Sequence, residues 1–398
     1  MANVSSSNGL EKRRKLAFRR ADGSSFPSWS RTSLSSIIEP YSEKVYGEHK
    51  YEVLTSSREG LQRQVDHFGS EQRHDTDGYN VIPFGYCTYR NRSDDGRFAF
   101  NINTISSNAI VSKFYPVFRF TNANSLFMSE FLNSSSRAKK KLSVLAVGTS
   151  QVVLSFEALK AADFDLPCKD EQDKIASFFE CLNRRIEYQR TLVDALKKYK
   201  RGVVAAILSH QLKFSDATGS PYPEWTSCTL QDAVDFLDGQ RKPLESADRA
   251  KRQGQYPYYG ASGIIDYIDD FIFDEPLLLL GEDGANILNR STPLCFIAEG
   301  KYWVNNHAHV MRPKAGQNIK FLCELLESLD YTRYNTGTAQ PKLNQEKCRR
   351  IELALPVYEE QCRIANFLSA LDQRADKAQS VLDYLLSNRA GLLQQLFI

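Results

Sequence analysis

Two histidines and one glycine-rich turn come nearest, by type and spacing, to a site that could do chemistry. His307 and His309, in "NNHAH", share one face of an expected strand and could bind a metal ion, but no third ligand stands at motif spacing. A strand whose histidines face a polar groove fits that spacing better. The turn "GEDGAN" at 281–286 could hold an anion, although a tight turn between two strands explains its glycines without any ligand.

Signatures of catalysis are missing from the sequence. It contains no GxxxxGK[ST] phosphate loop, no HExxH zinc motif, no GxSxG elbow and no GxGxxG after a strand. The Asn/Asp-Pro-Pro-aromatic tetrapeptide of amino-methyltransferases is missing too. The sequence therefore predicts no catalytic residue, no metal ligand and no cofactor site in this chain.

Several loops are instead rich in side chains that recognise DNA bases. Arginine pairs well with guanine, asparagine and glutamine pair with adenine, and serine and threonine adapt to either. This composition alone does not distinguish a DNA-binding loop, because most surface loops contain such residues. The loops are "TSSREG" (55–60), "TYRNRSDDGR" (88–97), "YYGASG" (258–263), "GEDGANILNRS" (281–291) and "YWVNNHAH" (302–309).

Length and composition set only broad limits. A chain of 398 residues is expected to form two or more domains. The net charge of +3 argues neither for nor against a nucleic-acid partner, and the eight cysteines form no CxxC pair, which is typical of free thiols in a reducing cytoplasm. No apolar run approaches the roughly 18 residues of a membrane span. The basic residues of 1–15 fit a solvated tail better than a contact with nucleic acid.

The chain repeats itself. Residues 148–208 align without a gap on residues 337–397, with identical residues at 17 of 61 positions, where chance would give about three or four. A second pair of segments, Leu16–Leu34 and Leu212–Leu230, shares "FPSW" and "YPEW". Between these alike blocks lie two middles that differ in length and sequence. The chain therefore contains two copies of one plan. Each copy has a starting segment and a final helix that resemble those of the other copy, and between them a middle that differs.

Each alike block ends in a helix of about 40 residues, roughly 60 Å long. Heptad positions a and d are mostly apolar in both copies and position e is often apolar too, so the stripe is wider than a strict two-helix seam. The two helices are expected to pair antiparallel. Arg185 and Arg374 fall at equivalent d positions, where they either fix the register or extend out of the seam.

The middles are strand-rich, with β-branched and aromatic runs punctuated by Gly, Asn and Ser. We therefore expect an α+β fold in which two strand-rich recognition domains are separated by two long helices that pair as an antiparallel coiled coil, with a pseudo-twofold internal repeat. The expected parts are a basic tail (1–15), a first domain (16–167), a first helix (168–210), a second domain (211–356) and a second helix (357–398).

Taken together, "LPCKDEQDKIASFF" and "LPVYEEQCRIANFL", the preceding "GTSQ" and "GTAQ" blocks, the "FPSW" and "YPEW" entries and the run from "YYGASG" to "NNHAHVMRP" resemble the specificity subunit of bacterial Type I restriction-modification systems. The resemblance spans nearly the whole chain. It implies a non-catalytic, cytoplasmic, DNA-associated subunit in which each divergent domain recognises one half of a split target in double-stranded DNA. It also implies helices that set the gap between the half-sites and dock two methyltransferase subunits, which carry S-adenosylmethionine, and restriction/motor subunits.

The resemblance directs attention to the loops as candidate DNA contacts and to the helices as docking elements. Two other readings stay open: a fused nucleic-acid methylase or nuclease, and a coiled-coil adaptor whose middles bind proteins. The candidate DNA-binding residues are Thr55, Ser56, Ser57, Arg58, Tyr89, Arg90, Arg92, Gln151, Tyr259, Ser262, Glu282, Asp283, Asn286, Asn305, Asn306, His307, Gln340 and Lys342. The candidate docking residues on the helices are Ile175, Phe178, Leu182, Leu196, Ile364, Phe367, Leu371 and Leu385.

Overall fold

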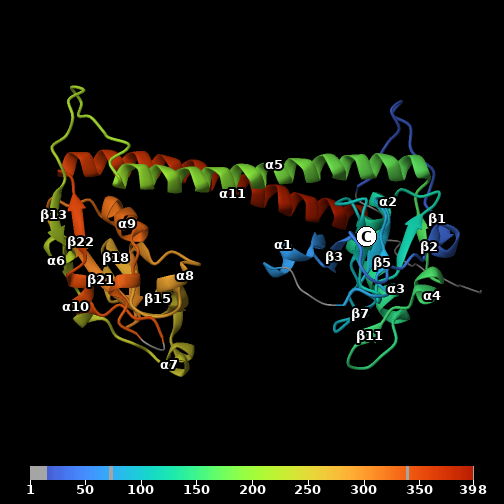
Figure 1. Cartoon of the computed structure of the whole chain (residues 1–398), viewed down its shortest axis with the longest axis horizontal. Helices are drawn as coiled ribbons and strands as arrows, with labels where there is room; N and C mark the ends of the chain where they lie inside the picture. The colour runs from blue at the N-terminus through green and yellow to red at the C-terminus, as the bar shows by residue number, and fades with distance from the viewer. Residues whose placement is uncertain (1–15, 71–74, 338–339, 398) are drawn as a thin grey trace, which may run out of the picture. The chain divides into compact units, whose positions relative to one another are not determined.

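The computed structural model of the chain describes residues 16–70, 75–337 and 340–397, so the expected basic tail at 1–15 lies outside the described residues. The chain divides into two compact units (Figure 1). Unit 1 contains residues 1–190 and 380–398, and unit 2 contains residues 191–379. Each unit combines sheets with helices, as expected for an α+β fold. No helix in the described part of the chain is long and apolar enough to cross a membrane.

The described part of unit 1 contains short strands and four short α-helices before its long-helix segments. In chain order these are β1 (Ser30–Ser33), β2 (Ile38–Tyr41), β3 (Glu52–Ser57), β4 (Gly60–Arg63), α1 (Gln64–Phe68), β5 (Asn80–Val81), β6 (Cys87–Tyr89), β7 (Arg92–Ser93), β8 (Phe100–Ile102), β9 (Ala109–Val111), β10 (Val117–Phe120), α2 (Ser125–Ser134), α3 (Ser136–Leu145), β11 (Val152–Val153), α4 (Phe156–Lys160) and β12 (Asp163–Leu166), with one 3-10 turn at Leu34–Ser36. Two four-stranded sheets, β2-β10-β6-β8 and β4-β3-β9-β5, form its body.

Unit 2 follows a related plan with different strands. Its elements are β13 (Thr226–Thr229), α6 (Leu230–Ala233), β14 (Val234–Phe236), α7 (Ser246–Lys251), β15 (Gln253–Gly260), β16 (Gly263–Ile268), β17 (Phe273–Asp274), β18 (Leu277–Gly281), α8 (Asn286–Asn289), β19 (Cys295–Ala298), β20 (Lys301–Val304), β21 (Ala308–Pro313), α9 (Ile319–Ser328), α10 (Gln345–Arg349) and β22 (Glu352–Leu355), with 3-10 turns at Asp238–Gln240 and Thr332–Tyr334. Its four-stranded sheets are β14-β21-β18-β19 and β16-β15-β20-β17. The strand pairs are antiparallel apart from β3–β9 in unit 1 and β15–β20 in unit 2.

The alike blocks of the sequence form the same frame in both units. In unit 1, β1 pairs antiparallel with β12, and Ser30 lies opposite Leu166. In unit 2, β13 pairs with β22 in the same way, and Thr226 lies opposite Leu355. Each pair brings the start of a repeat beside the strand that precedes its long helix. The internal repeat in the sequence is therefore a repeat of structure.

The two long helices are α5 (Lys169–Leu208) and α11 (Tyr358–Leu396), and each contributes one half to each unit. In unit 2, Lys200 bonds to Asp372 and Lys197 to Gln379, so the numbering falls along α5 as it rises along α11. In unit 1, Asn183 of α5 accepts a 2.6 Å hydrogen bond from Arg389 of α11. The helix segments within each unit therefore run antiparallel, as expected.

The prediction that positions d line the seam is wrong. The d side chains Phe178, Leu192 and Tyr199 are 40%, 47% and 57% exposed, whereas Phe179 and Val193, at positions e, are buried. An a–e spacing alternates steps of four and three residues as an a–d spacing does, and therefore makes an equally continuous stripe on a helix. The sequence bias toward apolar residues at e decides between the two.

This shift also resolves the role of the two arginines at positions d. Arg185 and Arg374 are both exposed, outside the buried stripe. They therefore extend out of the seam rather than fixing its register. A buried guanidinium would have carried a desolvation cost that the a–e arrangement avoids.

Candidate nucleic-acid interface

In unit 2, loops far apart in the sequence converge at the ends of three strands. The N–H of Asn305, after β20, donates to the carbonyl oxygen of Tyr259 at 3.1 Å. The N–H of Glu282, after β18, donates to the carbonyl oxygen of His307 at 2.8 Å, and the N–H of Leu343 donates to that of Glu282 at 2.7 Å. The candidate segments 259–262, 281–286, 305–307 and 340–342 thus meet in one place, which we call the unit 2 loop cluster.

Charged side chains of both signs gather in the unit 2 loop cluster. His307 Nδ1 lies 2.8 Å from Asp283 Oδ2, and Lys342 Nζ lies 3.4 Å from Glu282 Oε1. His307 and Lys342 each keep half of their side-chain surface exposed, while Glu282 is largely covered. Arg241 holds Glu282 from the other side at 2.8 Å. The exposed cluster therefore offers a cation, an imidazole and carboxylate acceptors to a ligand.

Sequence reasoning missed Arg241. Its side chain is only 14% exposed, and besides Glu282 it donates to the carbonyl oxygen of Ala308 at 2.8 Å. Its neighbours Gln240 and Lys242 are exposed beside the cluster. The one available signal was the polar run "DGQRKP" directly after a strand, a composition shared with ordinary turns.

His309 lies beneath the cluster and has a structural role. Its Nδ1 is 2.7 Å from Asp238 Oδ2 and its Nε2 is 2.8 Å from the carbonyl oxygen of Leu343. Two acceptors require both ring nitrogens to donate, which is the protonated form. Burial lowers the pKa of His309, but the hydrogen bonds and charges of Asp238 and Cys348 together outweigh it and raise that pKa to about 10. Both nitrogens of His309 are thereby engaged within the protein.

The described residues contain no group of three or more His, Cys, Asp or Glu side chains arranged to hold a metal ion.

The side chain of Asn286 stabilises its own loop, since its Nδ2 donates to the carbonyl oxygen of Thr292 at 3.0 Å and its Oδ1 accepts from the N–H of Thr292 at 2.9 Å. Asn305 is buried, and its Oδ1 accepts from the N–H of His307 at 2.8 Å. The side chains of Asn286 and Asn305 are thus engaged within the protein.

The remaining candidates in unit 2 differ in exposure. Tyr259 is partly buried, with its ring 5.8 Å from that of Phe296. Ser262, Asn306 and Gln340 are exposed. The three exposed side chains are free of the core and lie on the converging segments.

In unit 1, a second cluster brings three candidate segments together. Arg58, at the turn between β3 and β4, donates to Asp95 Oδ1 at 2.6 Å, and Gln151 donates to Asp94 Oδ1 at 3.0 Å. The Arg58 guanidinium and the Ser93 hydroxyl hold the pKa of Asp95 down at about 2. We call segments 55–58, 90–95 and 151 the unit 1 loop cluster. Like the unit 2 loop cluster, it is a group of converging loops with paired charged side chains, but the sequences of the two clusters differ.

Within the unit 1 loop cluster the candidates divide between surface and core. Arg58, Arg90 and Arg92 are exposed, and the Arg92 guanidinium lies 5.2 Å from the ring centroid of Phe114. Tyr89 is fully buried and its hydroxyl donates to the carbonyl oxygen of Leu154 at 3.0 Å. A buried Tyr89 supports the loop from beneath rather than offering a surface group. Thr55 and Ser57 are partly exposed.

Ser56 is a further buried candidate, with only 5% of its surface exposed. Its hydroxyl accepts from Asn101 Nδ2 at 2.8 Å, and the same amide group donates to the carbonyl oxygen of Ser57 at 2.8 Å. Ser56 therefore fixes the β3–β4 turn to β8.

The "GTSQ" and "GTAQ" blocks each begin with a glycine that lies close to the backbone of the glutamine three residues later. A Cβ on Gly148 would collide with the carbonyl oxygen of Gln151, and a Cβ on Gly337 would collide with that of Gln340. Gly148 also has a φ of 141°, a conformation that side chains disfavour. The glycines are thus needed where the backbones of Gln151 and Gln340 approach them closely.

The repeated Leu-Pro-x-x-x-Glu-Gln motif joins each long helix to its unit. Gln172 Nε2 donates to the carbonyl oxygen of Pro167 at 2.9 Å, while its Oε1 accepts from the N–H of Asn124, the N-terminal cap of α2, at 2.9 Å. Gln361 makes the same two bonds, to Pro356 and to Asn318, the cap of α9. This part of the motif is therefore explained by folding alone.

The candidate docking residues occupy two kinds of position. Ile175, Ile364 and Leu371 are buried in the core clusters of their units. Leu182, Leu196 and Leu385 are partly buried. The exposed rings of Phe178 and Phe367 are each met by a ring from the start of the same repeat, at 5.6 Å from Phe18 and at 5.7 Å from Phe214 respectively.

The comparisons with known proteins agree with this repeat. The family model of the type I restriction modification DNA specificity domain matches the chain twice, at residues 39–198 and 222–381. A Haemophilus influenzae protein named as a type I restriction enzyme specificity subunit is 33% identical over 149 residues, 37% of each chain. The EcoprrI specificity subunit of Escherichia coli is 29% identical over 145 residues, 36% of this chain and 35% of that protein. The matches thus span little more than a third of these relatives.

Solved structures resemble the chain over nearly its full length. The S subunit of a type I restriction-modification system from M. genitalium matches with a TM-score of 0.59 and 17% identity, covering 93% of this chain and 96% of that one. A chain from a study of assembly and conformational transition in the type I R-M system gives 0.55 and 15%, covering 93% and 98%. At such identities the likeness concerns the fold. Because the family model covers most of both repeats, the chain belongs to the type I restriction-modification DNA specificity family and carries that family's domain twice.

Proposed function

We propose that this chain is a non-catalytic specificity subunit that recognises a split target in double-stranded DNA, with one loop cluster for each half-site. The observation that carries the proposal is the convergence, in each unit, of loops that the sequence had marked as able to recognise bases. The two units share a frame and differ in their loops. One chain can therefore present two unlike recognition surfaces on alike supports.

Within each cluster, exposed and buried residues suit different tasks. Exposed Arg58, Arg90 and Arg92 in unit 1, and Lys342 and His307 in unit 2, are accessible to phosphates or base edges. Asp283 and Glu282 can accept hydrogen bonds from amino groups of bases, and Asp283 is the more exposed of the two. The buried candidates, among them Tyr89 and Asn305, hold the loops in place.

The same proposal assigns the partners. The long helices would dock two methyltransferase subunits, which supply S-adenosylmethionine and the methyl transfer, and restriction/motor subunits would join that core in the bacterial cytoplasm. The exposed apolar side chains Leu192, Tyr199 and Val381 along α5 and α11 support a docking role. DNA and these subunits are the partners, and no membrane is involved.

The test is sequence-specific methylation. The purified chain is mixed with its host's methyltransferase subunit, and methylated adenines are mapped by sequencing. We expect a two-part motif with the mixture and no methylation or cleavage by the chain alone. Activity of the isolated chain would indicate a fused enzyme, and a mixture without sequence preference would indicate an adaptor protein.

Variants assign each half of the motif to a unit. Arg58→Ala is expected to weaken or relax recognition of one half-site, and Lys342→Ala that of the other, by about 1–3 kcal/mol where a base contact is lost. Lys139→Ala, at an exposed lysine of α3 outside the cluster, serves as the control. If both variants altered the same half-site, the assignment of one unit to each half would be wrong.

Inserting four residues into one long helix tests the spacing role. An insertion near Tyr188 or Lys377 adds about 6 Å of helix. We expect the gap between the half-sites to change or the motif to disappear, while each half-site sequence stays the same. An unchanged gap would mean that the helices do not set it.

A further inference from the structure

In unit 2, helix α9 is fastened to the helix pair near its N-terminal end. Gln361 of α11 accepts from the N–H of Asn318, the α9 cap, and is itself 1% exposed. This attachment, at the N-terminal end of α9, leaves the direction of the helix to contacts further along it.

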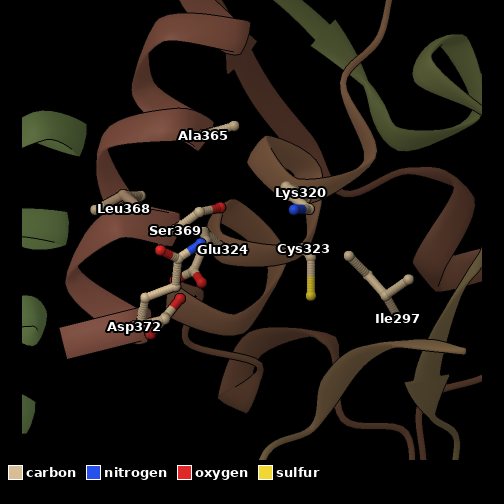
Figure 2. A pocket seen from close by; sticks show the side chains of 9 residues that line it. Ile297, Lys320, Cys323, Glu324, Ala365, Leu368, Ser369 and Asp372 are labelled. Carbon is tan, nitrogen blue, oxygen red and sulfur yellow. The ribbon is translucent and has the colours of Figure 1, made fainter. Parts of the chain in front are cut away.

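A second attachment lies along the same helix. Lys200 of α5 donates to Glu324 of α9 at 2.6 Å and to Asp372 of α11 at 2.8 Å, with the Lys200 and Glu324 side chains about four-fifths covered. Figure 2 shows Glu324 and Asp372 together in the wall of a pocket of about 280 Å³ between α9 and α11. Burial lowers the pKa of Lys200, but the two carboxylates outweigh it and the net pKa is raised, which keeps Lys200 charged. We call the contact of Lys200 with Glu324 and Asp372, and its counterpart at Arg389 in unit 1, the clamps.

Unit 1 repeats both attachments, with Arg389 in place of Lys200 and Asn183 in place of Asp372. Gln172 binds the cap of α2 as Gln361 binds the cap of α9. Arg389 of α11, which aligns with Lys200 in the repeat, contacts Glu130 of α2 and Asn183 of α5. Two copies with unlike loops thus keep the same three-way contact between a domain helix and both long helices.

The clamped helix is itself bonded to the sheet that leads to the loop cluster. Glu327 of α9 accepts from the N–H groups of Leu294 and Cys295 at 2.9 Å each, at the start of β19. Strand β19 pairs with β18, which ends at Gly281 beside Glu282. A shift of α9 against the helix pair would therefore move the sheet and the loops that follow it.

We infer that Lys200 and Arg389 are positioning residues that set the orientation of each loop cluster relative to the long helices, and thereby the permitted gap between the two half-sites. The inference rests on the proposed function. Two attachments six residues apart lie about 9 Å from each other along α9, which is enough to fix a direction where one attachment is not. The length of the long helices would separate the two loop clusters, and the clamps would fix the angle of each cluster relative to the helices.

The experiment compares Lys200→Met with Lys200→Arg in the full chain, mixed with the methyltransferase subunit. Methionine keeps the length of the stem without the charge, whereas arginine already fills the equivalent place in unit 1. For Lys200→Met we expect roughly tenfold less discrimination between the native gap and gaps one base pair longer or shorter, which corresponds to about 1.4 kcal/mol. Lys200→Arg should keep the native gap, and both half-site sequences should be unchanged in either variant.

Separate outcomes test the inference and the proposed function. If the unaltered chain directs no sequence-specific methylation, the proposed function fails. If it does, but Lys200→Met keeps the native gap preference, with or without a uniform fall in methylation, the positioning role is overturned. Should Lys200→Met fail to fold by circular dichroism, Glu324→Met takes its place, since it removes the acceptor on α9 and keeps the Lys200–Asp372 pair; a native gap preference there would likewise overturn the inference.

Discussion

Replacing Gln361 by leucine tests whether the Glu-Gln motif is a structural joint. The side chain is 1% exposed and makes three hydrogen bonds, accepting from the Asn318 N–H at 2.9 Å and donating to the Pro356 carbonyl oxygen at 2.9 Å and to Gln317 Oε1 at 3.0 Å. Leucine has a similar volume but offers no polar atom. The two backbone groups would lose their partner at a cost of about 1–3 kcal/mol each.

We therefore expect Gln361→Leu to lower the free energy of unfolding of unit 2 by about 2–5 kcal/mol, since added apolar burial offsets part of the loss. The assay is urea unfolding followed by circular dichroism. Gln172→Leu should cost unit 1 a similar amount because its two backbone bonds are the same. Gln373→Leu, at an exposed position of the same helix, is the control. A loss below about 1 kcal/mol, or an equal loss in the control, would refute the reasoning.

Three further predictions follow from individual residues. Gly337→Ala should displace Gln340 and destabilise unit 2 by about 1–3 kcal/mol in urea unfolding, because the added methyl group collides with the carbonyl oxygen of Gln340; wild-type stability would contradict this. The folded-state pKa of His309 is raised from 6.5 to about 10, so its contribution is complete below about pH 6.5 and declines as pH rises toward 10; His309→Gln should flatten that dependence in urea midpoints measured across the range, and an unchanged slope would exclude His309 as its source. Tyr89→Phe should cost about 1 kcal/mol in thermal unfolding without altering the methylated motif, and a changed motif would give Tyr89 a direct part in recognition.

The repeat was the part of the fold that the sequence predicted best. Identities such as Glu171-Gln172 with Glu360-Gln361 are local signals, and they fixed where the long helices begin. The heptad frame was harder, because two adjacent phenylalanines, Phe178 and Phe179, fit either face of the helix. Only the second lies in the core, while the first meets Phe18 from the start of the repeat.

The candidate loops were found by composition, but their grouping was not. Arg58 and Asp95 are 37 residues apart, and Arg241 and Glu282 are 41 residues apart. Such pairs depend on the order of strands in the sheets, which neither charge nor spacing along the chain reveals. For the same reason the burial of Tyr89 and Asn305, set among base-reading residues in the sequence, became visible only in the fold.

The division of the long helices between the units has a consequence for synthesis. The core of unit 1 includes Leu393, Leu396 and Phe397, and the ring of Phe397 lies 6.4 Å from that of Trp29 and 5.9 Å from that of Phe127. A ribosome adding about 5–20 residues per second needs roughly 20–70 s to go from Trp29 to Phe397. Translation of unit 1 starts first, but its core is complete only after unit 2 has been translated. Until then the apolar residues of that core remain accessible to chaperones. A truncation of the last turns of α11 should therefore damage the first half of the protein and spare the second.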